Sequence, residues 1–566
     1  MSLRARLRTL IQSARPAGGR AFSVEVPARP EHGDYATNAV VGSPDSARAI
    51  AERLRADGQD LIAAAEVAGP GFINIRLADR ALIAELARAL DAHDRWGWSD
   101  AGQGTTVRVE YFQLNIAKRP HVGHLRSAVI GDAIKRMLLS QGYRAVSDTH
   151  VGDWGTQFGI LLLAYQEYGG RERVAAGGDP FDALEELYVE ENARIEADPI
   201  RRERAKEEFA KLERGDPENR RIWQQMVDVS MRKLEESASR LGLVPFDMHV
   251  GESFYEGMMP DIVALALNEG VAHRTPDGAV VADLSADGLD EGVLLKSDGA
   301  STYLLRDLAT LRHMRSTLNF DRNLYVVDVR QAHYFRQLFR IAERLGFAGV
   351  AESVHIEFGF IVLPEGAMST RKGTAISLDA VLDEAVRRAR SVIAEKNSGL
   401  IDADTVAEQV GVGALKYFDL SHHRKSDIVF RWEEALSFDG NSGPYLQYTH
   451  ARLRSILRKI AKETEGTNGT KVPTHAALDA TEHRLLVSTL RFPEAIEDTL
   501  KDYTPNTLAN YLCNLAKLAN EFYHSHPVIQ EPDVTKRELR LALVAGVAQT
   551  LKSGLYLLGI VAPEEM

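Results

Sequence analysis

The stretch that decides the fold is Val107–Tyr143, VRVEYFQLNIAKRPHVGHLRSAVIGDAIKRMLLSQGY. Its β-branched and aromatic start, residues 107–112, predicts a buried strand. Apolar residues then recur at helical spacing from Ile130 to Leu138, and Gly142 suits the position just after a helix. The predicted order is strand, turn, helix, with His121-Val-Gly-His124 at the helix entrance.

A helix entrance of this kind is suited to an anion. The first turn of a helix has free N–H groups and the positive end of the helix dipole. Gly123 has no side chain to block a phosphate, and both imidazoles can donate hydrogen bonds. We predict that His121, Gly123 and His124 bind the phosphates of ATP and stabilise charge developing at the α-phosphorus. A pair of surface or core histidines is the alternative interpretation.

Composition sets the broad class of the protein. The chain has 566 residues, 45% of them hydrophobic and 26% charged, which is ordinary for a soluble globular protein of three or four domains. No apolar run reaches the ~20 residues that cross a membrane, and the single cysteine, Cys513, predicts a core residue, no disulfide and no cysteine-rich metal site. The basic N-terminus favours a first helix over a transit peptide. We therefore expect a cytoplasmic protein without membrane contact.

The net charge of −12 argues against non-specific coating of nucleic acid, although it allows a local basic face. Residues 1–98 predict a small α+β domain with a helix over 44–57 and a later strand in FINIRL. We expect residues 60–64 to continue that helix or to form a short separate piece. The sequence around Asp34, Tyr35 and Asn38 fits turn and cap positions as well as it fits a binding surface.

Residues 104–385 predict an α/β domain of the Rossmann-like, parallel-sheet kind, interrupted by an insertion over about 166–290. The insertion is rich in charged helical sequence and ends with a predicted hairpin around Pro276-Asp-Gly. The α/β pattern then resumes, with a strong buried-strand candidate at Leu324–Val329.

Two loops of this domain carry polar groups. Ala145–Thr149 predicts a second strand, after which Asp153, Trp154 and Gln157 lie where open α/β sheets bind ligands. The alternative is a tight turn with a packing tryptophan. Further on, the loop AMSTRKG suits contact with a polyphosphate, or is merely an exposed basic loop; its donor residues are Ser369, Thr370, Arg371 and Lys372.

From about residue 386 to 566 the periodicity is helical. The helix after Pro444 combines basic and aromatic side chains, which fits single-stranded RNA because bases stack and phosphates pair. A solvated helix face is the alternative. The candidate RNA-binding residues are Tyr445, Tyr448, Arg452, Arg454 and Arg458.

Together these features resemble a class I aminoacyl-tRNA synthetase. The strings NIAKRPHVGHLRS, HVGDWGTQFG, KSDGASTYLLRD and GPYLQYTHARL are similar to those of the arginyl-tRNA synthetase family, and the resemblance covers nearly the whole chain. It implies an N-terminal domain that contacts tRNA, with Asn38 in the contact, and a C-terminal anticodon-binding domain. It also implies a monomer.

The resemblance assigns roles at the ATP site. His121 and His124 would hold the triphosphate, and Met368, Ser369, Thr370, Arg371 and Lys372 would form the second signature loop. The usual K-M-S-K-S lysines are altered here, since Ala367 and Thr370 stand in their places. In this family a lysine just before H-x-G-H is thought to compensate, and Lys118 stands there.

For the arginine substrate, the resemblance implies Glu110, Asn115, Tyr303, Asp307 and Gln331, with Trp154 and Gln157 nearby. A guanidinium is planar, always charged and has five donors, so carboxylates and an aromatic wall suit it. Glu110 ends an otherwise apolar strand, where a charge is costly unless a cation binds it. For Asp307 the alternatives are a salt bridge to Arg306 or a helix cap. The chain has Gln113-Leu114 where the family more often has Ser-Pro, which predicts an altered pocket wall near Asn115.

The implied reaction joins L-arginine to its tRNA through an arginyl-adenylate, using ATP with Mg²⁺ on its phosphates and requiring bound tRNA for the first step. Two other functions are compatible with parts of the sequence: a smaller H-x-G-H nucleotidylyltransferase, and a non-catalytic tRNA-binding paralogue. The first would need neither the helical tail nor the N-terminal domain, and the second would lose the pocket.

Overall fold

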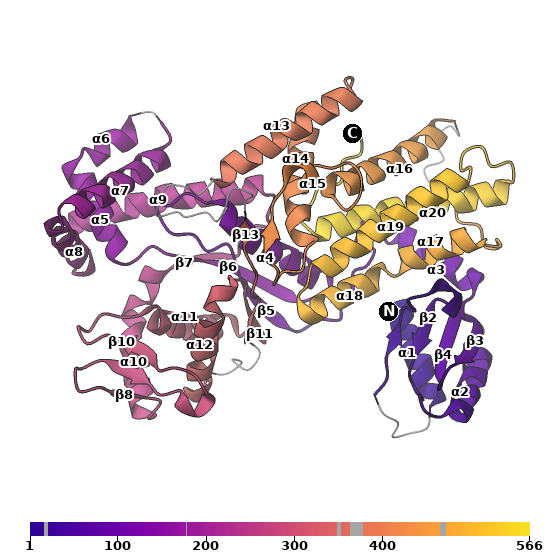
Figure 1. Cartoon of the computed structure of the whole chain (residues 1–566), viewed down its shortest axis with the longest axis horizontal. Helices are drawn as coiled ribbons and strands as arrows, with labels where there is room; N and C mark the ends of the chain where they lie inside the picture. Colours follow the sequence, from indigo (N-terminus) through magenta and orange to yellow (C-terminus); the bar gives the residue numbers. More distant parts are fainter. Residues whose placement is uncertain (16–20, 177, 348–352, 363–376, 464–470) are drawn as a thin grey trace.

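The computed structural model describes residues 1–15, 21–176, 178–347, 353–362, 377–463 and 471–566. At its centre is a five-stranded sheet in the order β12-β11-β5-β6-β7, in which every neighbouring pair is parallel (Figure 1). Its strands are β5 (Thr106–Glu110), β6 (Arg144–Val151), β7 (Met248–Gly251), β11 (Arg322–Tyr325) and β12 (Ser353–His355). The α/β class and the first three predicted strands of the sheet are thereby confirmed.

The helix predicted after β5 is α4 (Val122–Ser140). It ends where expected, because Gly142 has a φ of +79°, a left-handed conformation that glycine adopts without strain. Nearly all of α4 is buried, since the sheet lies on one side of it and helices of the C-terminal region lie on the other. The helix entrance is therefore held from both sides.

Two blocks interrupt the sheet, where a single insertion over 166–290 was predicted. The first block is helical and lies to the left in Figure 1. β7 then returns to the parallel sheet beside β6, so the predicted single insertion is wrong. β7 is short and only partly buried, which left no apolar run in the sequence to mark it. The helices of the first block are α5 (Thr156–Glu167), α6 (Gly170–Ala175), α7 (Pro180–Ala197), α8 (Ile200–Glu213) and α9 (Pro217–Arg240).

The second block contains the predicted hairpin, with β8 and β9 antiparallel around Gly278. A third strand, β10, extends this small sheet, and α10, α11 and α12 pack against it around a core of their own. The elements between β7 and β11 are η3 (Glu252–Met258), α10 (Met259–Asn268), β8 (Ala272–Arg274), β9 (Val280–Ala282), η4 (Ser285–Asp287), β10 (Gly292–Leu295) and α11 (Tyr303–Leu318). After β11 follow η5 (Val329–Gln331) and α12 (Ala332–Arg344).

The N-terminal module is an antiparallel sheet in the order β1-β2-β4-β3 with helices packed on it, at the lower right of Figure 1. Residues 62–64, expected to be helical, belong to β3. Their alanine-rich sequence favours a helix locally, but pairing with β4 along the whole strand overrides that preference. The elements are α1 (Leu3–Ala14), β1 (Val24–Glu25), η1 (Pro30–His32), β2 (Tyr35–Thr37), α2 (Pro44–Asp57), β3 (Ile62–Ala68), β4 (Phe72–Leu77), α3 (Asp79–Asp91) and η2 (His93–Arg95).

The C-terminal region is helical as predicted, except for β14, which pairs in parallel with β13. Cys513 is buried in α19, in agreement with its predicted core position. Among the described residues, no helix is long and apolar enough to cross a membrane. The elements are β13 (Ile361–Val362), α13 (Leu378–Lys396), α14 (Ala403–Leu420), β14 (Ile428–Val429), α15 (Trp432–Ala435), α16 (Gly443–Glu463), α17 (Ala480–Leu490), α18 (Phe492–Asp502), α19 (Asn506–Ser525) and α20 (Val534–Leu557).

Candidate active site

The two histidines of H-x-G-H cap the entrance of α4 with their own side chains. His121 is the N-cap residue, and its Nδ1 accepts a hydrogen bond from the backbone N–H of Gly123 at 3.0 Å. His124, three residues on, accepts the backbone N–H of His121 at its Nδ1, also at 3.0 Å. The pair forms a reciprocal capping box made of two imidazoles. Because each Nδ1 is an acceptor, the proton of each neutral ring is on Nε2.

This arrangement changes how the helix entrance can bind an anion. The N–H groups of His121 and Gly123, which we predicted to be free, are already used within the cap. The donors that the two rings offer a phosphate are their Nε2–H groups, and the ring centroids are 3.9 Å apart. Burial lowers the pKa of His121, and burial together with His121 lowers the pKa of His124 to about 3. Both rings are thus neutral donors at pH 7.

Gly123 is required by this pair of rings. A Cβ at position 123 would lie 2.7 Å from Cε1 of His121, closer than real Cβ contacts allow. The turn before the helix is also strained, since Phe112 and Ala117 have φ values of +59° and +55°. Non-glycine residues persist in such conformations only where the surrounding structure enforces them, and they concentrate at functional sites.

The second signature loop lies outside the described residues, so Met368, Ser369, Thr370, Arg371 and Lys372 cannot be placed. The residues that follow it are fixed beside the histidines. Ser377 forms an isolated bridge with His121, and the Leu378 N–H donates to Pro120 O at 2.9 Å. Lys118 lies on the same turn, with its ammonium 5.6 Å from the centre of the Tyr188 ring on α7.

At the carboxyl ends of β5 and β6 lies a buried charge cluster that the sequence interpretation missed. Arg108 on β5 is fully buried, and its guanidinium binds Asp148 in a bidentate way, with Nε–Oδ1 and N–Oδ2 distances of 2.8 and 2.6 Å. It also donates to Glu110 Oε2 at 2.5 Å and to Asn323 Oδ1 at 3.0 Å. The strand that ends at Glu110 is therefore not otherwise apolar, and the cation beside Glu110 is a residue of the chain itself.

Asp307 lies on the other side of this cluster, on α11. Its carboxylate accepts a hydrogen bond from the hydroxyl of Tyr334 and is 3.9 Å from Nε2 of His150. Neither predicted alternative, a salt bridge to Arg306 or a helix cap, holds for the described contacts: Arg306 pairs with Glu252 and Glu256 at 3.4 Å, and Thr302 caps α11.

Acidic groups outnumber the cations around His150. Burial disfavours protonation of this ring, but Glu110 and Asp307 outweigh it, and the pKa of His150 is raised. Burial raises the pKa of Glu252 to about 7 against the opposing effect of His150 and Arg306. Burial also raises the pKa of Asp148 despite the neighbouring Arg108. A site with this excess of buried carboxyl groups is electrostatically suited to a visiting cation.

The remaining residues predicted to bind arginine differ in their positions. Asn115 is exposed and forms a bridge to Gly152, where a Cβ would lie 2.1 Å from its Oδ1. Tyr303 starts α11, is 69% exposed and stacks with Arg306, so its ring is not a buried wall. Gln331 is exposed at the end of η5. Of this set, the structure brings Glu110 and Asp307 together around His150.

For the loop after β6, the packing interpretation describes Trp154 best. Its ring is buried edge-on against Phe209 and Trp223. Asp153 accepts two hydrogen bonds from Ser253, at 2.8 and 2.6 Å, and so fixes the start of η3. Gln157 is half-buried and donates to Gly152 O at 3.4 Å.

Three family models match the chain in order. Residues 86–432 match the catalytic domain of "tRNA synthetases class I (R)", residues 446–566 match the "DALR anticodon binding domain", and residues 1–77 match the "Arginyl tRNA synthetase N terminal domain". The first match alone covers more than half of the chain. The chain belongs to the class I arginyl-tRNA synthetase family.

Full-length relatives agree with this assignment. An arginine–tRNA ligase of Chloroflexus aggregans is 41% identical over 506 residues, covering 88% of this chain and 87% of the relative. One of Fusobacterium nucleatum is 37% identical over 537 residues, covering 93% and 92%. The structure of the Thermus thermophilus arginyl-tRNA synthetase matches with a TM-score of 0.80 at 29% identity, covering 100% of both chains.

In this family member, the basic face of α16 is partly occupied by the end of the chain. Arg454 binds Glu564 at 2.7 Å, and Arg458 binds Glu564 and Glu565 at 3.6 and 3.2 Å. Arg452 instead lies 4.4 Å from the ring centre of Tyr523. Two of the three arginines predicted to contact RNA thus also hold the C-terminal tail.

The aromatic residues of α16 also differ from one another. Tyr448 is 40% exposed, with the Lys396 ammonium 5.8 Å from its ring centre, whereas the hydroxyl of Tyr445 accepts a hydrogen bond from Asn520 at 2.8 Å. Tyr448 lies within residues 446–566, which match the anticodon-binding domain, and Tyr445 directly precedes them.

In the N-terminal module, Asp34 and Tyr35 are structural. Asp34 binds His483 on α17 and accepts the Leu77 N–H at 2.7 Å, and the Tyr35 hydroxyl donates to Glu494 on α18 at 2.8 Å. Both residues hold the module on the helical domain. Asn38 is exposed; its Oδ1 accepts the Ser23 N–H at 2.8 Å.

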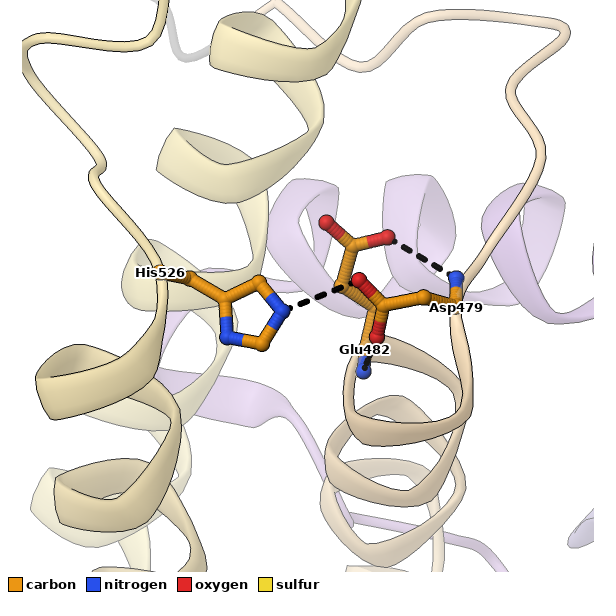
Figure 2. A group of neighbouring side chains, drawn as sticks. All are labelled: Asp479, Glu482 and His526. Atoms are coloured by element: carbon orange, nitrogen blue, oxygen red, sulfur yellow. Dashed lines mark hydrogen bonds and ion pairs between the residues drawn. The ribbon is translucent and has the colours of Figure 1, made fainter.

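Asp479, Glu482 and His526 gather at the start of α17 with ligand atoms within 4.8 Å of one another (Figure 2). Their contacts are those of a helix cap. Asp479 and Glu482 form a capping box, and His526 Nε2 binds Asp479 at 2.9 Å. Glu482 is fully buried against Arg540 at 2.9 Å. Since the backbone N–H groups of the cap and Arg540 already bind these carboxylates, the group does not suit a metal ion.

Proposed function

We propose that this synthetase activates L-arginine with ATP and transfers it to the terminal ribose of its tRNA. The arginine carboxylate attacks the α-phosphorus of ATP, which enters as its Mg²⁺ complex, and pyrophosphate leaves. A ribose hydroxyl of tRNA then attacks the arginyl carbonyl of the adenylate, and AMP leaves. The observation that carries the proposal is the pair of neutral imidazoles, each with its Nε2–H unused in the cap, at the strand–helix turn beside a carboxylate-rich sheet edge.

In the first step the protein positions ATP and arginine and stabilises the charge that develops on the phosphates. The Nε2–H groups of His121 and His124 donate to oxygens of the triphosphate as negative charge shifts toward the leaving pyrophosphate. Lys118 supplies a positive charge on the same turn, and the loop residues 368–372 complete the phosphate contacts.

The amino-acid end of the site recognises a guanidinium. Asp307 presents a carboxylate that no arginine or lysine neutralises among its described contacts. Asn115 and Gln331, both exposed, contact the α-amino and carboxylate groups, and Tyr303 closes over the side chain from the start of α11. The protein acts as a monomer in the cytoplasm, which light scattering and cell fractionation would test.

The decisive experiment is ATP–pyrophosphate exchange with each of the twenty amino acids, with and without tRNA. We expect exchange with arginine, and only when tRNA is bound. His121→Ala and His124→Ala should each lower the exchange rate by about 10²–10³, the usual cost of one well-placed transition-state donor. The matched control is His475→Ala, since His475 is exposed before α17. Exchange with another amino acid, or near-normal exchange in both variants, would refute the proposal.

For tRNA, the helix α16 reads the anticodon arm. Arg452→Glu should raise the KM of tRNA at least tenfold while leaving the KM of ATP unchanged, because a phosphate contact becomes repulsive. Arg454→Glu would have a mixed effect, since it also breaks the pair with Glu564. Glu564→Gln separates the two causes: it breaks the same pair but leaves Arg454 in place, so tRNA binding should not weaken.

A further inference from the structure

The guanidinium of Arg108 already occupies carboxylates of the proposed arginine pocket. Its side chain is fully buried, and four of its five N–H groups have acceptors: two on Asp148, one on Glu110 and one on Asn323. The Tyr325 ring lies 5.2 Å from its central carbon. Carboxylates in bidentate reach and an aromatic wall are the features expected around a substrate guanidinium.

Both carboxylate oxygens of Glu110 already accept a hydrogen bond from side chains of the protein. Its Oε2 accepts from Arg108 at 2.5 Å, and its Oε1 accepts from Gln113 at 3.3 Å. Arg108 and Glu110 are two residues apart on one strand, so their side chains share a face of the sheet. Asp148 is the residue directly beside Glu110 on β6. The pairing is therefore built into the register of the sheet.

We propose that Arg108 is a specificity-determining residue that competes with the substrate guanidinium for Glu110. This leaves Asp307 as the main carboxylate that recognises arginine and keeps the affinity of the pocket for arginine low. The inference rests on the proposed arginine-dependent activity, and it adds a residue of this chain that weakens binding rather than strengthening it.

The local charge allows a clean test. Arg108, Glu110 and Asp148 together carry a formal charge of about −1 at neutral pH if both acids are ionised. Replacing Arg108 alone would leave two buried carboxylates without their cation, which is strongly destabilising. Replacing Arg108 and Asp148 together by apolar residues removes the ion pair as a unit, keeps the charge at about −1 and leaves Glu110 free. Such paired replacements are often neutral for stability.

The experiment compares the wild-type enzyme with the Arg108→Met/Asp148→Val variant in tRNA-dependent pyrophosphate exchange. We expect the KM of arginine to fall about tenfold or more in the double variant, the effect of one charge-assisted hydrogen bond, while the KM of ATP stays the same. Adding Glu110→Gln to the double variant should abolish the gain. Thermal unfolding of each variant establishes that the compared proteins are folded.

The outcomes separate the two proposals. If wild-type protein shows no arginine-dependent exchange, the proposed function fails. If exchange is present but the double variant leaves the KM of arginine unchanged or raises it together with the KM of ATP, Arg108 is only a structural ion-pair residue and the inference is overturned. A gain that survives Glu110→Gln would equally overturn it. If the double variant fails to fold, Arg108→Lys provides the measurement: a lysine cannot make the bidentate and Glu110 contacts together, so an unchanged KM of arginine in that variant would overturn the inference.

Discussion

Two of the histidine–aspartate pairs among the described residues have opposite surroundings. His483, on α17 where this helix contacts the N-terminal module, binds Asp34 and Asp79 through its two ring nitrogens, at 3.0 Å each. His150, at the edge of the parallel sheet, lies 3.9 Å from Asp307. In the first pair, which we call the closed pair, both ring nitrogens of the histidine are hydrogen-bonded to carboxylates. The second pair, which we call the open pair, has no hydrogen bond between its two side chains, and the carboxyl groups around it outnumber the positive charge that His150 can supply.

The carboxyl groups report the same difference. Burial disfavours the charged form of Asp34, but the hydrogen bonds from His483 and Leu77 outweigh it and lower its pKa. At the sheet edge, burial prevails and raises the pKa of Glu252 to about 7. Buried charges that have partners within the protein stabilise the fold, whereas buried charges without enough partners occur mainly at sites where a ligand supplies the missing partner. The comparison therefore predicts that one pair affects stability and the other affects substrate binding.

The largest expected effect is at the open pair. Asp307→Asn removes the carboxylate proposed to bind the substrate guanidinium and should lower kcat/KM for arginine by about a hundredfold or more, since a charged partner of a charged group is lost. The unfolding temperature should stay within a degree or two. Pyrophosphate exchange and thermal unfolding measure the two quantities, and Asp261→Asn, an exposed change on α10, is the control. A large loss of stability with normal arginine kinetics would contradict this prediction, because Asp307 would then be a structural residue.

At the closed pair we expect the opposite. His483→Gln should reduce the free energy of unfolding by about 3 kcal/mol, because two carboxylates lose a buried partner, and should leave the KM of arginine unchanged. Denaturant unfolding provides the measurement, with His475→Gln as the matched control in the preceding exposed loop. An altered KM of arginine with normal stability would show that the interface is part of the site.

The same residue gives a pH dependence. Burial lowers the pKa of His483, but Asp34 and Asp79 outweigh burial and the net pKa is raised. A raised pKa means that the folded state holds the proton more tightly. The contribution is complete below the unfolded pKa of about 6.5 and is lost as pH rises through the higher folded value. The stability difference between wild type and His483→Gln should therefore shrink at alkaline pH; a difference that grows with pH would contradict the assignment.

Apolar periodicity in the sequence predicted the elements that form the proposed ATP site, but it could not predict which side chains pair with one another. β5, α4 and Gly142 follow from apolar spacing and from one positive φ position, which are local properties. The pairs of Arg108 with Asp148 and of Arg454 with Glu564 join residues 40 and 110 positions apart. The sequence did contain a signal for the contact of Arg108 with Glu110, since residues two positions apart on a strand point to the same face of the sheet. β7 left no such signal.

The smallest expected effect comes from Glu252, which tests whether the open pair senses its acidic surroundings. Glu252 is 8% exposed, pairs with Arg306 at 3.4 Å and faces His150, Asp307 and Asp153. As pH rises through about 7 its carboxyl group loses a proton, so the pocket becomes more negative and binds a guanidinium more tightly. We expect the KM of arginine to fall roughly fivefold between pH 6 and 8, an interaction of about 1 kcal/mol.

Glu252→Gln should flatten this pH profile, because glutamine does not titrate, while Glu269→Gln at the exposed end of α10 should keep it. The KM of ATP provides the internal reference, since the pKa of His124 is lowered to about 3 and that of His121 is also lowered. If the profile persists in Glu252→Gln, His150 is the titrating group, because its pKa is raised from the ordinary value. Because His150 gains positive charge as pH falls, its protonation would also raise the KM of arginine at low pH. The excess of carboxyl groups in the pocket would still be the cause, since these groups raise the pKa of His150.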